Sequence, residues 1–509
     1  AEGIAPTADR DVLDRLERLI DSSAVTAGPV GDSVRYRMLE PLRLYAAGTL
    51  DEAGESDGVM ERLLDYFMVA LADLEDGLRG PDQLVWLEKV EADLGTLRAV
   101  LDWAAAHAPV RGLQLTAMLG WFWYLRGSGS EARERLQTAL DAAGDRAPAR
   151  WRGDGHFLLS LHDSRPDRSR PGFEAALEAY RTAGYDRGVA NATAMIAVWG
   201  FDWDQTIELL EEAVATYSAV GDQWGLALAR FLQSGAAQVA SDNATSLRLA
   251  QEAADRFAAV GDRWGQGYSR YSVGVALRAA GDYEGAESAF RAALENARPM
   301  RLRREMAPVM CELASIATMR GDYEAARQLL DEAQAYADEI PFAGSRGMIA
   351  NAKGRLARLE GDLDASQRLH QKAIELFDGE QNPNGLAYSK SCLGFALEMT
   401  GDYGGALAQH RQALEHVAHT RDTFAVAYSL EGIGAALVAA TEPSRGAELI
   451  GAGLGIRERA GTPLPSGEHF DVDRALEAAR AAVGAVAIDE ALARGRALDM
   501  DTAIELASS

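Results

Sequence analysis

Hydrophobic and polar positions repeat with a period of forty residues along the central part of the chain. Four similar segments show this period: GDYEGAESAFRAALENA from Gly281, GDYEAARQLLDEAQAYA from Gly321, GDLDASQRLHQKAIELF from Gly361 and GDYGGALAQHRQALEHV from Gly401. Small and large apolar residues recur within them at helical spacing, as Ala286, Phe290 and Ala293 and again as Ala326, Leu330 and Ala333. This stripe predicts amphipathic helices that approach their neighbours closely.

A Gly-Asp pair opens each of these segments and predicts a tight turn between two helices. Glycine adopts the left-handed conformation that ends one helix, and the following Asp can cap the next helix. A second set of pairs, at Gly221 and Gly261, stands in AVGDQWG and AVGDRWG and marks the other junction. Seven positions before the inner turn a small residue recurs, as Gly274, Ala314, Gly354 and Gly394. Each unit is therefore predicted to be a closely packed helix pair.

These units resemble the tetratricopeptide repeat at most of its marker positions, although the usual repeat is only about 34 residues long. Fainter units extend in both directions, so we expect about eight or nine helix pairs over residues 109–457. The resemblance implies an all-α fold: a right-handed superhelical solenoid with a concave groove lined by the first helix of each pair.

The chain begins differently, with the order helix, strand, turn, strand, helix over residues 9–56. The segments are DVLDRLERLID, SAVTAG, PVGDS and VRYRML, with a helix starting at Glu40 and Pro41. This order is typical of the second half of a winged helix. The alternative is a hairpin that only caps the solenoid.

Two flanking segments resemble one family of bacterial regulators. RYRMLEPLRLYAAGTLDEAGE and GLRGPDQLVWLEKVEADLGTLRAVLDWA (Gly77 to Ala104) are similar to the region that follows the nucleotide-binding module in STAND-type regulators, the large AfsR-like and LuxR-like transcription factors of actinomycetes. The closing segment, Gly446 to Ala507, is similar to the last helices of the same family. We accordingly predict a partial winged helix at 1–56, linking helices at 57–108, the tetratricopeptide-like array at 109–457 and a C-terminal helical cap at 458–509.

The resemblance implies a sensor and regulatory region that controls an upstream ATPase and DNA-binding module of the same polypeptide. The signal would be a small molecule, a peptide or a protein. ATP is expected only in that upstream module, since none of the four lysines here follows a glycine and precedes Ser or Thr. We interpret residue 1 as a boundary within a longer protein. The alternative function is a free-standing tetratricopeptide scaffold for protein–protein interaction.

The composition narrows the class of partner. A net charge of −26 argues against direct DNA binding by this segment. No apolar run approaches the length of a membrane span, and Cys311 and Cys392 fit neither a metal site nor a disulfide framework. We expect a cytoplasmic protein with no cofactor of its own, and the sequence leaves its oligomeric state open.

No arrangement of nucleophile and base can be assigned from the spacing, so we interpret the chain as a non-enzyme. His410, His416 and His419 do not share one helical face, and we expect solvated or capping histidines rather than a metal site. GAGLG (Gly451 to Gly455) lacks the preceding strand of a dinucleotide loop, and tight helix packing explains it better.

Counting back from each Gly-Asp turn gives the residues expected to face the groove. They are Tyr268, Tyr271, Arg278, Asn351, Arg355, Arg358, Tyr388, Ser391, Tyr428 and Glu431. Tyr and Arg are favoured in recognition surfaces, and Arg355 with Arg358 could jointly grip a carboxylate or phosphate. The alternative is that these arginines pair with acidic residues of neighbouring repeats. The aromatic run GWFWYLRG (Gly120 to Gly127) is expected in part as core and in part as an interdomain contact.

Overall fold

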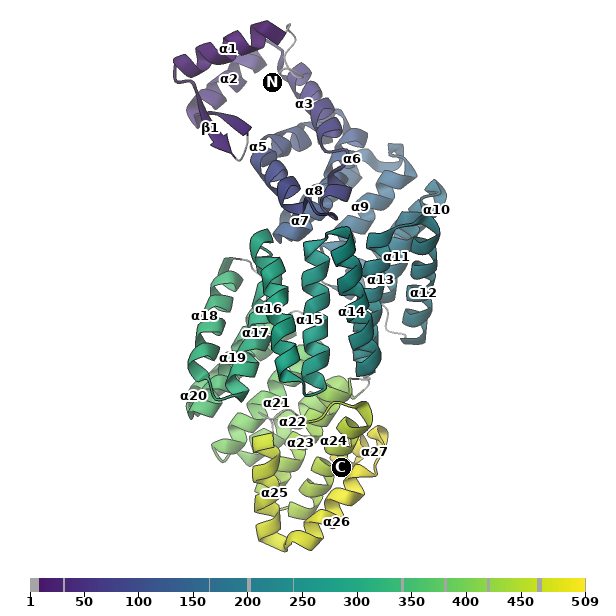
Figure 1. Cartoon of the computed structure of the whole chain (residues 1–509), viewed down its shortest axis with the longest axis vertical. Helices are drawn as coiled ribbons and strands as arrows, with labels where there is room; N and C mark the ends of the chain where they lie inside the picture. The colour runs from purple at the N-terminus through teal and green to yellow at the C-terminus, as the bar shows by residue number, and fades with distance from the viewer. Residues whose placement is uncertain are drawn as a thin grey trace.

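The computed structural model describes residues 9–30, 33–163, 165–198, 203–240, 242–339, 343–379, 382–418, 422–464 and 469–508. These residues form helices from one end of the molecule to the other, with one two-stranded sheet near the N-terminus (Figure 1). The predicted all-α superhelical fold is confirmed.

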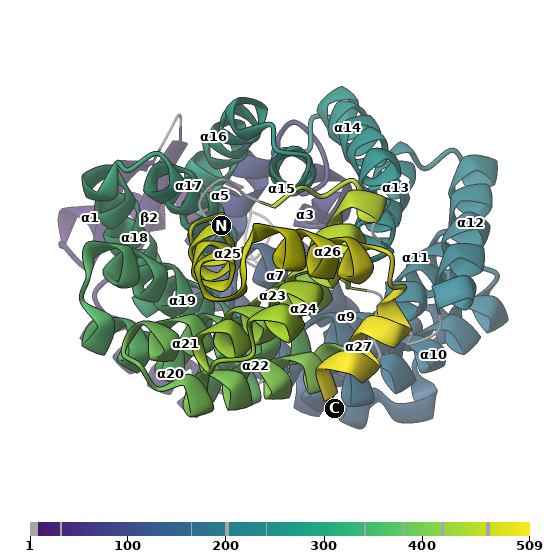
Figure 2. The ribbon, with the colours of Figure 1, turned by 90° about the horizontal axis from the view of Figure 1, so that it is seen from below.

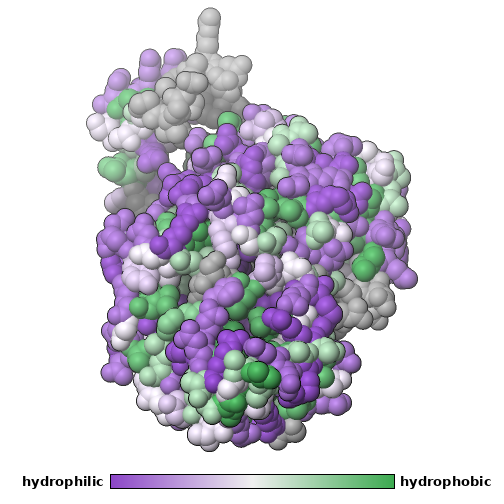
Figure 3. Space-filling view, turned by 60° about the horizontal axis from the view of Figure 1, so that its bottom comes forward, coloured by the Kyte–Doolittle hydropathy of each residue, from purple (hydrophilic) through white to green (hydrophobic). Residues whose placement is uncertain are grey.

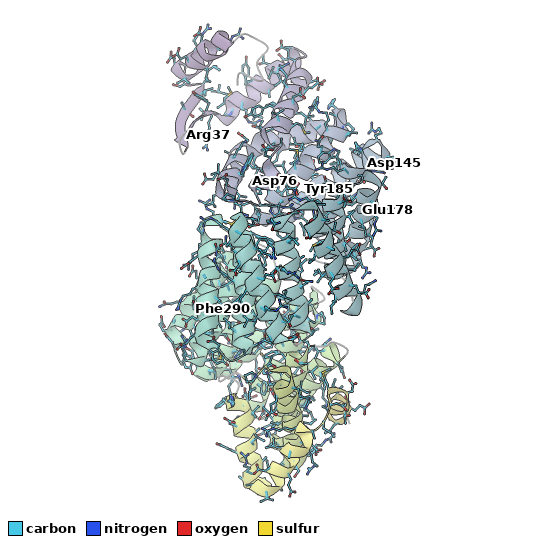
Figure 4. The ribbon with its side chains drawn as sticks, turned by 45° about the vertical axis from the view of Figure 1, so that its right-hand side comes forward. Arg37, Asp76, Asp145, Glu178, Tyr185 and Phe290 are labelled. Carbon is cyan, nitrogen blue, oxygen red and sulfur yellow. The ribbon has the colours of Figure 1, made fainter. Side chains whose placement is uncertain are left out.

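The N-terminal unit has the predicted element order. Helix α1 (Asp9–Asp21) precedes strands β1 (Val25–Val30) and β2 (Ser33–Met38), and α2 (Glu40–Glu52) follows. The strands are antiparallel, with Val25 paired to Met38. The unit lies at the end of the molecule away from the C-terminal helices, where Figure 4 labels Arg37. Its assignment to a winged helix stays a prediction.

An arm of three helices joins this unit to the array. It comprises α3 (Ser56–Ala70), α4 (Leu74–Gly77) and the long helix α5 (Gln83–His107). Its apolar residues, among them Leu64, Leu87 and Leu97, belong to a hydrophobic core that continues into the array as far as Leu356. The arm is therefore packed onto the repeats rather than tethered to them.

Nine helix pairs follow in the described residues, at the upper end of the expected number, when α6 (Pro109–Met118) and α7 (Gly120–Arg126) are counted as one interrupted helix that pairs with α8 (Gly129–Ala143). The first seven helices of the array are α6 (Pro109–Met118), α7 (Gly120–Arg126), α8 (Gly129–Ala143), α9 (Ala149–Leu161), α10 (Pro166–Ala183), α11 (Asp186–Val198) and α12 (Trp203–Val220), with a short 3-10 turn at Gly144–Arg146. The forty-residue repeats supply α13 (Gln223–Val239), α14 (Asn243–Val260), α15 (Arg263–Ala279), α16 (Tyr283–Met300), α17 (Arg303–Met319), α18 (Tyr323–Glu339), α19 (Ala343–Glu360), α20 (Leu363–Gly379), α21 (Pro383–Met399), α22 (Tyr403–Val417), α23 (Thr423–Ala439) and α24 (Pro443–Ala460).

The Gly-Asp turns have the predicted geometry. Gly281 and Gly401 adopt φ angles of 84° and 87°, in the left-handed region that a side chain would strain. The Asp282 carboxylate accepts the backbone N–H of Gly285 at 2.9 Å, and Asp402 caps α22 in the same way. The turn residues therefore end one helix and start the next, as the sequence indicated.

The small–large–small stripe lies at the contact between the helices of a pair. A Cβ placed on Gly274 would come within 2.6 Å of the Phe290 ring, so glycine is what lets α15 approach α16. Two repeats later the position of Phe290 is taken by His370 and then by His410, both 0% exposed. The expectation of a solvated or capping residue is wrong for His410, because the histidine replaces a core aromatic. His416 is exposed, and His419 lies outside the described residues.

The superhelix closes into a ring when seen along its axis (Figure 2). The first helices of successive pairs contact one another on the inner side, as α17 does α19 and α19 does α21. The C-terminal helices α25 (His469–Val483) and α26 (Ala485–Arg496) lie across the opening of this ring, and α27 (Met500–Ser508) closes the edge. Gly451 and Gly455 face the backbone of α26 at Leu492 and Arg496, so tight packing accounts for GAGLG.

The predicted domain boundaries fall near helix boundaries, since α3 begins at Ser56, α6 at Pro109 and α24 ends at Ala460. Their status as separate domains stays a prediction. The surface in Figure 3 is mainly hydrophilic, with hydrophobic residues in small separate patches. Among the described helices, none combines the length and the apolar character that a membrane crossing needs.

Candidate binding groove

The candidate residues separate into three groups along the inner side of the ring. Tyr268 and Tyr271 line an apolar cavity, whereas Arg278, Asn351, Arg355 and Tyr388 line a polar cavity beside it. Arg358, Ser391, Tyr428 and Glu431 are buried and line neither cavity.

The apolar cavity has a volume of about 240 Å³ and lies between α15, α16 and α17. Trp264, Tyr268 and Tyr271 form its aromatic wall, and Val309 and Met348 form the opposite side. The Trp264 and Tyr268 rings are 4.9 Å apart, which fixes this wall as one packed unit. The cavity suits an apolar group.

The polar cavity has a volume of about 260 Å³ and reaches from α15 to α23. The Arg278 guanidinium pairs with Glu312 at 3.0 Å, from the first helix of the next pair. The Arg355 guanidinium donates to the Tyr388 hydroxyl at 2.7 Å. Two guanidinium groups and one carboxylate thus line this cavity, and the balance of charge is positive.

Asn351 lines the polar cavity, and its side chain has two polar neighbours. Its amide N–H donates to the Ser389 hydroxyl at 2.8 Å, and its amide oxygen lies 3.0 Å from Nδ1 of His370. Burial, together with the charges of Arg358 and Arg355, lowers the pKa of His370 to about 3, so the imidazole is neutral. Met348 lines both cavities, which are therefore neighbours in one groove.

The four buried candidates of the third group contact other side chains of the protein. Arg358 binds the Asp471 carboxylate of α25 through two hydrogen bonds, of 2.6 and 2.9 Å. Glu431 is paired in the same two-pronged way with Arg457 of α24, at 2.7 and 2.9 Å. Tyr428 is buried, with its ring 5.6 Å from that of Tyr388. The buried Ser391 hydroxyl lies 3.4 Å from that of Ser429.

Arg355 and Arg358 have different hydrogen-bond partners. Arg358 holds the carboxylate of Asp471, whereas Arg355 faces the polar cavity beside Tyr388. Pairing between neighbouring repeats, the alternative weighed from the sequence, accounts for Arg278 with Glu312. For the other candidates that line the two cavities, a binding role stays a prediction.

Sequence reasoning missed several residues of the groove. Cys311 lines the polar cavity, and it stands ten positions before Gly321, just as Asn351 stands ten before Gly361. The forty-residue period could therefore have identified Cys311 as a groove residue. Burial raises the pKa of the Cys311 thiol. Trp264 and Met348 carried no such signal, because apolar residues at helical spacing are equally typical of core.

The arm reaches the array beside the apolar cavity. The Gln83 side chain, at the start of α5, donates to the Asp262 carboxylate at 2.7 Å and accepts the backbone N–H of Arg263 at 2.7 Å. Asp262 also accepts the indole N–H of Trp224.

Other residues of the arm contact the array nearby. The Arg79 guanidinium stacks on the Trp224 ring at 4.1 Å. Figure 4 labels Asp76 of α4 and Tyr185 in this region, and Asp76 pairs with Arg187 at 3.4 Å.

The aromatic run on α7 packs against this joint, and its expected role as an interdomain contact stays a prediction. The Trp121 ring lies 5.0 Å from Trp264 and 5.6 Å from Trp224, edge to face in both cases. Trp123 is buried in the core. In the part of the chain that the structure describes, no group of His, Cys, Asp and Glu side chains is placed to hold a metal ion.

No family model matches the chain. It is similar to proteins named as HTH-type transcriptional regulators of Mycobacterium tuberculosis and Mycobacterium bovis, at 28% identity over 239 residues, which cover 44% of this chain and 27% of each regulator. The chain thus spans about a quarter of the length of the curated relatives it matches.

Among solved structures, a Rap protein complexed with Competence and Sporulation Factor is similar, with a TM-score of 0.52 and 13% sequence identity. The likeness covers 69% of this chain and 98% of the Rap chain. At this identity it shows the superhelical fold alone.

Proposed function

We propose that this chain is the sensor and regulatory repeat region of a STAND-type transcriptional regulator. It binds a signal in the concave groove and controls an ATPase and DNA-binding module of the same polypeptide. The observation that carries the proposal is the pair of adjoining cavities on the inner side of the array. The similarity to HTH-type regulators supports the regulatory role. No catalytic step is assigned to this chain.

The lining of the groove defines the chemistry of the signal. An apolar part would occupy the wall formed by Trp264, Tyr268 and Tyr271. An acidic or hydrogen-bonding part would lie against the Arg355 guanidinium and the Tyr388 hydroxyl, which line the same cavity. We therefore propose an amphiphilic acid: a small molecule or a short peptide with one carboxylate and an apolar body. The Rap protein complexed with Competence and Sporulation Factor shows that a superhelix of this fold accommodates a ligand.

The same contacts offer a route from the groove to the arm. A ligand against Trp264 would press on a ring that packs on Trp121 and Trp224, and Trp224 in turn packs on Arg79 of the arm. A ligand shifts such an equilibrium only by its difference in affinity for the two states. The route is proposed as the physical link by which binding changes how the arm sits on α13 and α15.

The N-terminal unit supports an attached module. Three large apolar side chains of this small unit, those of Leu39, Leu44 and Tyr45, are 60%, 58% and 75% exposed. Apolar residues gathered on one exposed unit are typical of a surface that another domain covers. We propose that the ATPase and DNA-binding module packs here.

A thermal-shift screen of the chain against amphiphilic acids, nucleotides and short peptides tests the proposal. A ligand at 100 times its dissociation constant adds about 2.7 kcal/mol to the free energy of unfolding. The shift should be lost in Arg355→Ala and in Tyr268→Ala. Arg291 and Tyr403 belong to the outer helices α16 and α22, and their side chains are exposed, so Arg291→Ala and Tyr403→Ala are the matched controls that should keep the shift. A shift that survives in all four variants would place the binding site outside the groove.

A further inference from the structure

Helix α25 lies inside the opening of the superhelix rather than on its outer wall (Figure 2). It packs on α23 and α24, and its charged side chains reach α19 and α21. The inner surface of the last repeats is therefore a helix-docking surface, and α25 fills it.

Two oppositely charged pairs fix α25 on this surface. Asp471 is 2% exposed and is held by Arg358, which is 5% exposed. Arg474, three residues later on the same face, pairs with the buried carboxylate of Glu398 at 2.9 Å. The surface thus presents a cation from α19 and an anion from α21, and α25 presents the complementary anion and cation one turn apart.

An apolar stripe completes the match. Val472, Ala475, Leu476 and Ala479 recur at helical spacing on α25 and are buried. They belong to one cluster with Cys392, Phe395, Tyr428 and Ala435 of α21 and α23. The recognised pattern is therefore an amphipathic helix with an acid, an apolar residue, and an arginine three positions after the acid.

Helix α26, which follows α25 in the chain, is packed differently from α25. Gly484, with a φ angle of 92°, separates α25 from α26. Helix α26 contacts the backbone of α24 through Gly495, which approaches Glu448 and Ala452, so no side chain fits between these two helices. Helix α25 instead docks through side chains.

The docking surface adjoins the polar cavity. Arg355, which lines the cavity, is one helical turn from Arg358, which holds α25. Phe424 also lines the cavity, and its ring stacks on that of Tyr428 at 5.9 Å. A ligand in the cavity and α25 on its surface therefore share a wall.

We propose that α25 is an exchangeable occupant of the surface formed by α19, α21 and α23, and that a partner helix with the same acid-to-arginine pattern displaces it. The proposal rests on the proposed function in taking the inner side of the ring as the recognition surface. It adds the partner: a helical protein segment whose binding is limited by release of α25.

A peptide of residues 469–483, HFDVDRALEAARAAV, carrying a fluorescent label is the probe. Its anisotropy is measured on titration with the full chain and with Asp471→Ala/Arg474→Ala, which weakens the resident helix. A tethered competitor acts at millimolar effective concentration, so we expect the variant to bind the peptide at least about tenfold more tightly than the unaltered chain. Adding Arg358→Ala to the variant should abolish that gain.

Asp473 and Arg480 lie on α25 with side chains 64% and 42% exposed, so Asp473→Ala/Arg480→Ala is the matched control and should bind like the unaltered chain. Equal peptide affinity for all four chains, or binding by none of them, overturns the proposal. Circular dichroism confirms that each chain is folded.

Hydrogen exchange of the unaltered chain gives a second measurement that needs no variant. Amides of α25 should exchange faster than those of α26 by at least about tenfold, through local opening. Exchange of both helices at one common rate would overturn the proposal. If the peptide binds but no small molecule stabilises the chain in the thermal-shift screen, this inference stands and the amphiphilic acid is rejected as the signal. If a small molecule stabilises the chain but the peptide does not bind, the proposed function stands and this inference is rejected.

Discussion

Gln83 and Asp262 are 179 residues apart in the sequence and share a buried hydrogen bond of 2.7 Å. Both side chains are 0% exposed, and the bond joins the first turn of α5 to the turn before α15. The arm is thus fixed to the array at the aromatic joint, next to the apolar cavity.

Replacing Gln83 tests this joint. Gln83→Ala leaves the Asp262 carboxylate with one donor fewer, which costs about 1–3 kcal/mol for a buried group and raises the pKa of Asp262 further. Gln83→Glu should cost more, because it places a second carboxylate against the first. Urea denaturation measures the loss, and faster hydrogen exchange at the start of α5 locates it. A change below about 0.5 kcal/mol in both variants would show that the joint does not hold the arm.

Two buried ion pairs, Arg358 with Asp471 and Arg457 with Glu431, test whether α25 can separate from the repeats. Removing one partner of a fixed buried pair costs about 3–5 kcal/mol, because the other charge stays buried without a partner. Glu431→Ala should show this full cost, since Arg457 cannot reach water without separating α23 from α24. Asp471→Ala should cost less, because release of α25 exposes Arg358. Chemical denaturation of the two variants measures both costs, and equal values would show that α25 is fixed.

Acid should destabilise the protein through two core histidines. Burial, together with the charge of Arg358, lowers the pKa of His410 to about 3, and the pKa of His370 is lowered to the same value. Because an unfolded histidine has a pKa near 6.5, protons favour the unfolded chain below that pH, at about 1.4 kcal/mol per histidine for each pH unit down to about 3. Stability from this source is therefore complete above about pH 6.5 and is lost as the pH falls.

His410→Phe should reduce the loss of folding stability at low pH, because it removes one buried histidine. Phenylalanine should fit this position, since Phe290 occupies the equivalent position of another repeat. The exposed His416 of the same helix gives the control His416→Phe, which should leave the pH dependence of folding stability unchanged. The measurement is the urea midpoint between pH 7 and pH 4. An identical pH dependence in His410→Phe and the unaltered chain would contradict the assignment.

The His410 ring lies between two glycines of neighbouring first helices. A Cβ on Gly432 would come within 2.2 Å of this ring, and a Cβ on Gly394 within 2.5 Å. We expect Gly432→Ala to cost about 1–3 kcal/mol through overpacking. His410→Ala removes the ring, so the double variant should be more stable than the sum of the two single changes predicts. Thermal melting of the four chains tests this, and simple additivity would show that the glycine does not make room for the ring.

The repeat architecture could be predicted from the sequence because it depends on local chemistry. Gly281 and Asp282 specify a turn and a cap wherever they occur, and a forty-residue period makes that signal visible several times. The stripe of Ala286, Phe290 and Ala293 likewise needs only helical spacing. The histidine at position 410 was misjudged because its polarity hid its place in the same stripe.

The candidate site was only partly predictable, because the sequence gives no sign of which groove positions the chain itself covers. The period places Arg355 and Arg358 on one helical face, and only one of them meets the cavity. What separates them is Asp471, 113 residues from Arg358. Long-range contacts of this kind depend on how far the superhelix turns, which the period does not specify.

The most direct test of the sensor proposal is hydrogen exchange of the whole chain with and without the amphiphilic acid that stabilises it most in the thermal-shift screen. We predict protection on the inner helices α15, α19 and α21, which line the two cavities, and a change in exchange at the start of α5, where the arm joins the array. Protection confined to outer helices such as α16 and α20, or no stabilising acid at all, would contradict the groove as the sensor site.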